Sequence, residues 1–194
     1  MDQSFENPAP HGDLDPQAEN LLLRASLTQM QARIEELERL IDIDGLTAIP
    51  NRRRFVAELE RTVVRTGRHG TPSSVVFIDL NGLRSINETK GYLAGDAAII
   101  HVAKLLSGLI RATDTLARIG GDEFGLILDH LDQNSAIETS ERLARCIART
   151  PMELGGASVT VEATFGVTTI LPGDALEDVM RRADRNVAAA KNEG

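Results

Sequence analysis

Residues Arg118–Leu128 read RIGGDEFGLIL, and the organisation of the whole chain can be worked out from this stretch. It has the form of a strand end, a two-glycine turn and a second strand that is apolar apart from Gly125. Paired glycines supply the positive φ angles of a tight hairpin and leave no side chain to obstruct a ligand on the backbone. Asp122 and Glu123 project two adjacent carboxylates from the turn. Taken alone, the pattern also fits a solvated hairpin.

The composition is that of a globular protein with a reduced cysteine. The chain has 194 residues, 42% hydrophobic and 26% charged, which suffices for one domain and an extension. No apolar run approaches the roughly 20 residues of a membrane-spanning helix. The acidic, proline-dotted N-terminus does not resemble a secretory signal. The single cysteine, Cys146, excludes an intramolecular disulfide and fits a reducing cytoplasm. We therefore expect a cytoplasmic protein, and the short apolar runs predict no membrane segment.

The net charge of −8 narrows the class of ligand. It argues against a non-specific binder of nucleic-acid polymers or anionic membranes. It does not exclude a nucleotide, because an acidic protein can hold phosphates through divalent cations bound to its carboxylates. The four histidines show no metal-ligand spacing.

The first 43 residues divide into two segments. Residues 1–19 contain three prolines and several acids without an apolar period, and we expect a disordered tail. Residues 20–43 carry a heptad seam, which predicts a parallel coiled-coil dimerisation helix. The alternative is a single amphipathic helix lying on its own domain. The seam consists of Leu23, Leu27, Met30, Ile34, Leu37 and Ile41.

Residues 44–194 alternate between helical and strand patterns. Pro50 suits the first turn of a helix that runs to about Thr66. Residues 74–80 (SVVFIDL) predict a buried strand with Asp79 near its end, where ligands usually lie in α/β sheets.

Beyond this strand, residues 81–87 begin a short helix. Gly91–Gly95 predicts a turn, after which Asp96 opens the next helix. The remaining expected elements are strands over 114–119 and 124–128, a helix over 135–149, one or two strands within 159–170 and a helix over 175–191. This order predicts an α/β fold with a mixed central sheet flanked by helices.

Four ordered blocks together resemble one family. They are DGLTAIPNRR at 44–53, FIDLNGLRSINETKGYLAGD at 77–96, RIGGDEF at 118–124 and ADRNVAAAK at 183–191. Their order and separations resemble the GGDEF domain, the catalytic domain of diguanylate cyclases, whose fold is similar to the nucleotidyl cyclase and polymerase palm. The resemblance covers residues 44–194. Any one block alone would be a weak signal.

The resemblance implies that two GTP molecules condense into cyclic di-GMP with release of two pyrophosphates. In each half-reaction a 3′-hydroxyl attacks an α-phosphate, a step that needs charge neutralisation more than covalent help. The expected cofactor is Mg²⁺, two ions per active half-site, with Mn²⁺ as an alternative. The implied catalytic acids are Asp79, Asp122 and Glu123, and the implied metal ligands are Asp79, Asp122 and the Leu80 carbonyl.

The same resemblance assigns the nucleotide contacts. Asn87 and Asp96 would read guanine, because a carboxylate accepts hydrogen bonds from both its N1–H and its exocyclic amine. From the residues alone, Asp96 also fits a helix N-cap. The implied phosphate contacts are the backbone amides of Gly82, Leu83 and Arg84 and the side chain of Lys191, which also fits a helix C-terminal cation.

Arg111 and Asp114 resemble the RxxD inhibitory site at which product arrests the enzyme. The pattern alone carries little weight, since it recurs at Arg181–Asp184. Its position carries more, because five residues separate Asp114 from Gly120, as in the family. The alternative is an arginine at a helix end followed by a turn aspartate.

Several positions depart from the family pattern without removing a proposed ligand. In the family the sequence continues past the final glycine with Arg-Asn, and that arginine helps to hold phosphate. Because the chain stops at Gly194, we expect weakened substrate binding, as in a chain trimmed from a longer protein. The departures are Asn81 for Asp, Gly82-Leu83 for a commonly aromatic pair, Arg84 for Lys, Tyr92 for His and Ala188 for Tyr.

The expected function is an active diguanylate cyclase that works as a homodimer. One domain holds one GTP, so two must face each other, and a coiled coil would supply that proximity. The alternative is a catalytically silent cyclic di-GMP receptor that signals through its coiled coil. A third interpretation is a scaffold that uses the domain only to dimerise.

Overall fold

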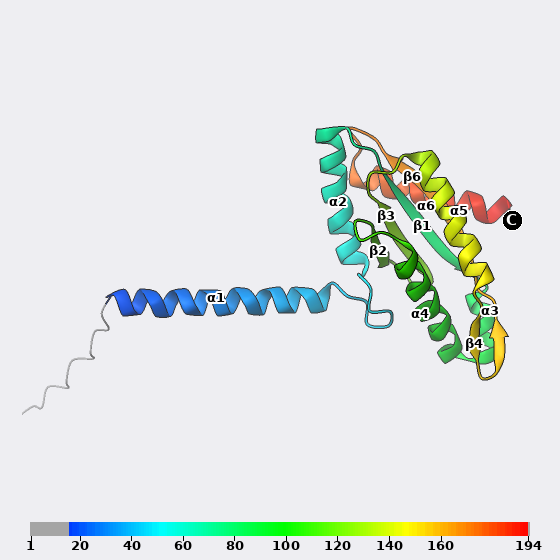
Figure 1. Ribbon diagram of the computed structural model, residues 1–194, viewed down its shortest axis with the longest axis horizontal. Helices are drawn as coiled ribbons and strands as arrows, with labels where there is room; N and C mark the ends of the chain where they lie inside the picture. The colour runs from blue at the N-terminus through cyan, green and yellow to red at the C-terminus, as the bar shows by residue number, and fades with distance from the viewer. Residues whose placement is uncertain (1–15, 194) are drawn as a thin grey trace, which may run out of the picture. The chain divides into compact units, whose positions relative to one another are not determined.

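The N-terminal helix forms a unit separate from the rest of the chain. The structure, a computed structural model, describes residues 16–193 and divides into two compact units between Ile41 and Asp42 (Figure 1). The predicted tail lies outside the described residues except for 16–19, which belong to α1 (Pro16–Ile41). Five seam side chains of α1 are 44% to 63% exposed: Leu23, Leu27, Met30, Ile34 and Leu37. The pairing of this seam with a second copy stays a prediction.

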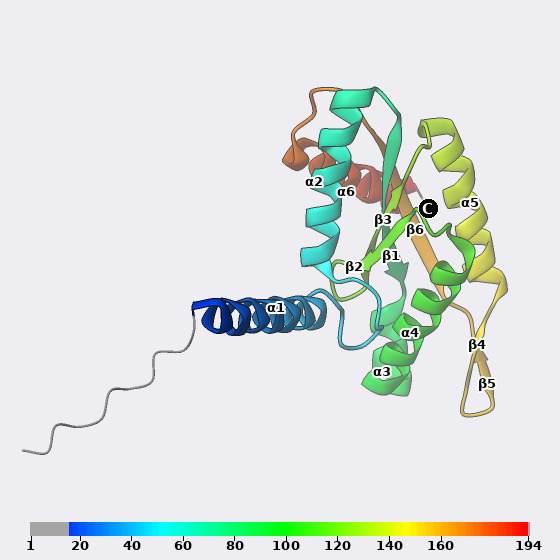
Figure 2. The same ribbon diagram turned by 60° about the vertical axis from the view of Figure 1, so that its left-hand side comes forward.

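The second unit is a sheet with helices on both faces (Figure 2). Its first elements are α2 (Arg52–His69), β1 (Ser73–Asn81), α3 (Leu83–Lys90), α4 (Tyr92–Leu109) and β2 (Thr115–Arg118). They are followed by β3 (Glu123–Leu128), α5 (Gln133–Arg149), β4 (Met152–Leu154), β5 (Ala157–Val159), β6 (Glu162–Ile170) and α6 (Leu176–Glu193).

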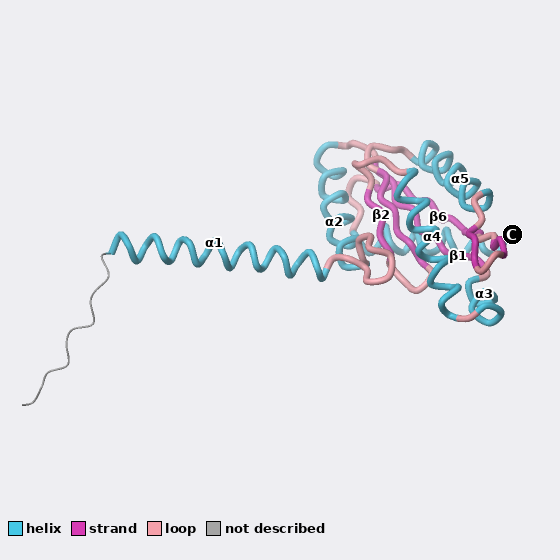
Figure 3. Tube along the Cα trace, turned by 60° about the horizontal axis from the view of Figure 1, so that its bottom comes forward, coloured by secondary structure: helices cyan, strands magenta, loops and turns pink. Residues whose placement is uncertain are grey.

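The central sheet has the strand order β2-β3-β1-β6, with the strands side by side (Figure 3). These four strands pair antiparallel, and an isolated parallel bridge joins Asn51 to Arg118 at the β2 edge. The predicted α/β fold, with its mixed sheet and flanking helices, is confirmed. In the register of β1 and β3, Asp79 lies opposite Glu123. The short strands β4 and β5 pair separately, and β4 was not predicted.

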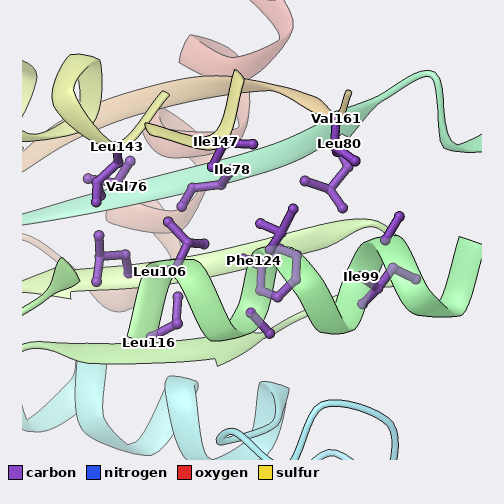
Figure 4. Close-up of a cluster of buried hydrophobic side chains, with 14 of the residues drawn as sticks. Val76, Ile78, Leu80, Ile99, Leu106, Leu116, Phe124, Leu143, Ile147 and Val161 are labelled. Atoms are coloured by element: carbon purple, nitrogen blue, oxygen red, sulfur yellow. The ribbon is translucent and has the colours of Figure 1, made fainter. Parts of the chain in front are cut away.

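Alternate residues of β1 pack into two different cores, because successive side chains of a strand point to opposite faces. Val76, Ile78 and Leu80 face α4 and α5 (Figure 4). Val75 and Phe77 face α2 and α6. Asp79 is the next residue on the same face of β1 as Val75 and Phe77, so its carboxylate lies on the α6 face of the sheet.

Helix α4 packs with α5 on one face of the central sheet. Among residues 16–193 it alone is long and apolar enough to cross a membrane, with a mean hydropathy of 1.2. Its apolar face is instead buried in the domain through Ile99, Val102 and Leu106. The helix therefore has the character of a core helix of a globular domain.

Two helix starts differ from the predictions. The predicted turn over Gly91–Gly95 is wrong, because the chain turns at Gly91 alone, with φ of 87°, and α4 begins at Tyr92. Asp96 therefore lies inside the helix and is not its N-cap. Pro50 precedes α2, whose N-cap is Asn51, with its side chain accepting a hydrogen bond from the backbone N–H of Arg54.

Candidate active site

The two-glycine turn is fastened to the end of the central strand. We call residues 119–123 the signature turn. The amides of Ile119 and Gly120 donate to the Glu123 carbonyl at 2.9 and 3.2 Å, which closes the turn. The Leu80 amide donates to the Asp122 carbonyl at 3.0 Å. The backbones of the two predicted metal-binding segments are therefore in direct contact.

A small hollow on the α6 side of the turn is lined by charged side chains. It has a volume of about 220 Å³ and an apolar floor that includes Phe77 and Val187. Lys191 Nζ lies 2.7 Å from Asp79 Oδ1, and the Asp79 side chain is 12% exposed. A cation thus already neutralises the buried acid at the end of β1. The polar residues that line the hollow are Asp79, Glu123, Asp184 and Lys191.

The pKa of Glu123 is raised by burial and by the acids around it. Desolvation raises the pKa of its carboxyl, and the charges of Asp79, Asp122 and Asp184 raise it further, while Lys191 opposes the shift. The carboxylate lies over Gly120, where a Cβ atom would collide with it. A side chain at Gly120 would therefore displace the Glu123 carboxylate from the turn. The positive φ angles expected of the paired glycines are wrong, because neither Gly120 nor Gly121 has a positive φ.

The residues at this strand end suit a magnesium ion. Within residues 16–193, no three Asp, Glu, His or Cys side chains are grouped closely enough to enclose a metal by themselves. Mg²⁺ does not need such a cage, because it is usually bound by one or two carboxylates together with waters and substrate phosphates. Asp79, Asp122 and the Leu80 carbonyl offer oxygen donors on adjoining backbone segments. The donor set fits the predicted ion.

A second, larger hollow lies on the α3 side of the turn. Its volume is about 540 Å³, which is within the size range of small-molecule sites. Asp122 lines this hollow, whereas Asp79 lines the hollow on the α6 side. The two predicted metal ligands thus approach from opposite sides of the signature turn. The residues around the second hollow are Leu83, Arg84, Asn87, Glu88, Tyr92 and Asp122.

The start of α3 borders this second hollow. Gly82, with φ of 72°, precedes the helix without a side-chain cap. The amides of Leu83 and Arg84 therefore lie at a helix N-terminus, where phosphates bind favourably. The Arg84 side chain forms an ion pair with Glu88, with its Nε atom 2.8 Å from Glu88 Oε1. The phosphate contact predicted for the amides of Gly82, Leu83 and Arg84 stays a prediction.

Of the two predicted base-reading residues, Asn87 lines the second hollow, whereas Asp96 of α4 is not one of the residues that line it. The Asn87 side chain packs on Gly95, the residue before Asp96, so closely that a Cβ atom at Gly95 would overlap it. The Asn87 Oδ1 atom is buried and has no hydrogen-bond partner within residues 16–193. A buried polar atom without a partner is costly, so a ligand N–H that reached it would be bound favourably.

The predicted inhibitory pair, Arg111 and Asp114, lines a separate hollow. Asp114 accepts hydrogen bonds from the amides of Arg111 at 2.9 Å and Asp129 at 3.2 Å, which fixes its carboxylate. Arg111 is exposed. Both residues line a hollow of about 530 Å³ together with Arg54 and Glu58 of α2.

The charged residues of these hollows that were missed in the sequence are Arg54, Glu58, Glu88 and Asp184. Asp184 lies seven residues before Lys191, a spacing that puts both on one face of a helix and could have identified it. Arg54 lies far from Arg111 in the chain, and no sequence signal connects the two.

The chain is similar in sequence and in fold to known proteins. The sequence profile described as diguanylate cyclase, GGDEF domain, matches residues 41–194. MucR of Pseudomonas aeruginosa, a bifunctional diguanylate cyclase/cyclic di-GMP phosphodiesterase, is 32% identical over 169 residues. The match covers 86% of this chain and 24% of MucR, so the chain spans a minor part of that relative's length.

Solved structures share the fold. The coiled coil and GGDEF domain of DgcB from Caulobacter crescentus, in complex with c-di-GMP, superimposes with a TM-score of 0.81. At 24% identity, over 92% of this chain and 95% of that one, this likeness is one of fold. The diguanylate cyclase SiaD of Pseudomonas aeruginosa, solved with its activator SiaC, has a TM-score of 0.76 and 26% identity, covering 92% of this chain and 75% of SiaD.

Proposed function

The chain belongs to the diguanylate cyclase GGDEF domain family, and from this premise we propose that it is an active diguanylate cyclase. It would join two GTP molecules into cyclic di-GMP in two steps. In each step a 3′-oxygen bonds to an α-phosphorus and the bond to pyrophosphate breaks. The observation that supports this most is the meeting of the end of β1 with the signature turn, where Asp79 pairs with Lys191 opposite Glu123.

We assign the metal to the acids at this strand end. Asp79, Asp122 and the Leu80 carbonyl would hold Mg²⁺, or Mn²⁺ in its place, and Glu123 adds a further carboxylate. When bound, the metal would neutralise charge that develops on the reacting phosphates. Lys191 would then turn from Asp79 towards phosphate, since a divalent ion competes for the same carboxylate.

The nucleotide would occupy the hollow on the α3 side. The buried Asn87 Oδ1 atom needs a donor, which the amino group of guanine provides. Asp96, one residue beyond Gly95, would accept from N1–H and the same amino group. The triphosphate would extend over the amides at the start of α3 towards Asp122.

Catalysis would require two copies of the chain, because each domain binds one of the two GTP molecules. The exposed apolar seam of α1 supports a parallel dimer that raises the effective concentration of one loaded domain near the other. Product bound at Arg111 and Asp114 would arrest the enzyme.

Turnover is tested by incubating the chain with GTP and Mg²⁺ and separating the products by chromatography. We expect cyclic di-GMP and pyrophosphate from wild type and from Glu153→Gln, an exposed acid on β4 outside the site. Asp122→Asn should make neither. Absence of product from folded wild-type dimer would refute the proposal.

A second candidate function is supported by the hollow at Arg111 and Asp114. Its pre-formed carboxylate needs no metal, so a catalytically silent chain could still bind cyclic di-GMP there. Calorimetry separates the two functions. Binding of cyclic di-GMP without turnover of GTP, lost in Arg111→Ala, would favour the receptor over the enzyme.

A further inference from the structure

Arg118 lies directly behind the signature turn, although no role in the proposed reaction has been assigned to it. Its Nη2 and Nε atoms lie 2.7 and 3.3 Å from the carbonyl oxygen of Gly121, the residue before Asp122. Its Nη1 atom lies 3.2 and 3.3 Å from the two carboxylate oxygens of Asp44. One guanidinium therefore joins the signature turn to a residue 74 positions earlier in the chain.

Asp44 belongs to a closed loop between α1 and α2, residues 42–51, which we call the linker loop. Its Oδ1 atom accepts hydrogen bonds from the Thr47 amide and hydroxyl at 2.9 and 2.7 Å. The Asn51 amide closes the loop onto the Asp42 carbonyl at 2.9 Å. Desolvation alone would raise the pKa of Asp44, but hydrogen bonds from Thr47 and Arg118 outweigh it and lower that pKa. Asp44 is therefore a charged and well-fixed partner.

The backbone reinforces the contact between the linker loop and the turn. The Arg118 amide donates to the Pro50 carbonyl at 2.8 Å, next to the parallel bridge between Asn51 and Arg118. Arg52 Nη1 lies 3.4 Å from the carbonyl oxygen of Ile119. The end of the linker loop thus pairs with Arg118 at the end of β2, and Arg52, the first residue of α2, reaches the first residue of the signature turn.

No side chain anchors the backbone at Gly121. A Cβ atom placed there would meet nothing within 4 Å, and the preceding residue is also a glycine. Two successive glycines rotate easily, so the peptide group before Asp122 needs a hydrogen bond to hold it. The guanidinium provides that bond from a largely buried position, since its side chain is 15% exposed and that of Asp44 is 21% exposed.

We propose that Arg118 is a positioning residue, and that the chain of contacts from Asp44 through Arg118 to the Gly121 carbonyl couples the linker loop to the orientation of Asp122. A change in the linker loop would release the Gly121 carbonyl and re-aim the adjacent carboxylate. The inference rests on the proposed function only for its effect on turnover. The coupling itself concerns the folded chain.

Hydrogen exchange measures the coupling without reference to activity. We expect amides of residues 119–123 to exchange at least about tenfold faster in Asp44→Asn and Arg118→Ala than in wild type, because the turn opens locally. The matched control is Asp174→Asn, which breaks the ion pair between Asp174, just before α6, and Arg182 of α6, whose Nη2 lies 2.6 Å from Asp174 Oδ2. It should leave exchange in the signature turn unchanged.

Kinetics with GTP and Mg²⁺ then tests the consequence for catalysis. We expect kcat to fall about 10- to 100-fold in Asp44→Asn and Arg118→Ala, with KM for GTP within about threefold of wild type. Arg118→Lys keeps the charge but cannot fork, so its kcat should lie between these values. The double variant Asp44→Asn/Arg118→Ala should be no slower than Arg118→Ala, because both changes break one connection.

The outcomes separate the coupling from the proposed function. Unchanged exchange of residues 119–123 in Asp44→Asn would overturn the coupling, as would kcat effects of the two single variants that multiply in the double variant. A wild-type chain that makes no cyclic di-GMP refutes the proposed function, while the exchange experiment still decides the coupling. If Arg118→Ala does not fold, Asp44→Asn and Arg118→Lys carry the same test.

Discussion

At the scale of single residues, Asp96 allows a test of nucleotide recognition. If the residue reads guanine, its removal should weaken nucleotide binding, which the loss of a helix cap would not do. Asp96 lies in α4 directly after Gly95, the residue on which the Asn87 side chain packs. Hydrogen bonds to a charged group contribute about 1.5–3 kcal/mol, so Asp96→Ala should weaken binding of a non-hydrolysable GTP analogue by roughly 10- to 150-fold. The inosine analogue, which lacks the exocyclic amine, should lose less.

Calorimetric titration of both analogues into wild type and Asp96→Ala measures this difference. An equal loss for the guanine and inosine analogues would contradict the assignment of Asp96 to the amine. The melting temperature serves as the control, because Asp96 does not cap α4 and its removal should leave stability nearly unchanged.

Asp174 gives a prediction about pH. The hydrogen bonds from Arg182 lower the pKa of Asp174 below its usual value of 3.8, against the opposing effect of desolvation. A carboxyl whose pKa is lowered on folding stabilises the protein above its unfolded pKa, and this contribution is lost as the pH falls. Asp174→Asn should therefore cost about 2 kcal/mol at pH 7, or roughly 4–8 °C in Tm.

Thermal melts from pH 7 down to pH 3 measure the contribution of Asp174. The difference between wild type and Asp174→Asn should shrink as the pH falls below 3.8. A difference that stays constant over this range would show that the ionised carboxylate is not the source of the stability.

At the scale of elements, the placement of α6 depends on a single glycine of β6. A Cβ atom at Gly166 would lie 2.8 Å from the Ala183 carbonyl oxygen and would collide with the backbone at Val187. Gly166→Ala should push α6 from the sheet at a cost of about 2 kcal/mol, and it should weaken GTP binding because α6 carries Lys191.

Gly108→Ala is the matched control for Gly166→Ala. Gly108 lies in α4 and has open space where its Cβ would be, so alanine there should leave Tm unchanged or raise it slightly. Chemical denaturation measures both variants. A Gly166→Ala chain as stable as wild type would show that α6 is not held by this close approach.

The helices and strands with long apolar patterns could be predicted from the sequence, and the short ones could not. β1 and β3 were found because buried apolar runs such as VVFI and FGLIL stand out. The start of α4 was mistaken because Gly95 resembles a turn glycine, whereas its role is to admit the Asn87 side chain. β4 has three residues, too few for a period to appear.

The arrangement of the site was only partly accessible from the sequence. The resemblance located Asp79, Asp122 and Lys191, but register is set by the folded sheet, so the opposition of Asp79 and Glu123 could not be derived. The contact between Asp44 and Arg118 joins residues 74 positions apart and has no local signal.

At the scale of the whole molecule, α1 should determine the oligomeric state. The seam side chains Leu27 and Ile34 are 59% and 55% exposed, an apolar stripe that a second helix would cover. The double variant Leu27→Asp/Ile34→Asp should be monomeric and at least about tenfold less active at equal concentration.

Sedimentation measures the mass of this variant beside Gln31→Asp, an exposed position outside the seam. The control should remain a dimer with wild-type activity. A double variant that is still dimeric would place the dimer contact elsewhere in the chain.

The account depends most on Asp79 and Asp122 serving one metal centre, although they line hollows on opposite sides of the signature turn. The direct measurement is calorimetric titration of Mg²⁺ into the chain loaded with a non-hydrolysable GTP analogue. We predict that Asp79→Asn and Asp122→Asn each abolish the same binding event, and that the double variant is no worse than either. Wild-type binding in one single variant, or two losses that add in the double variant, would contradict a shared centre.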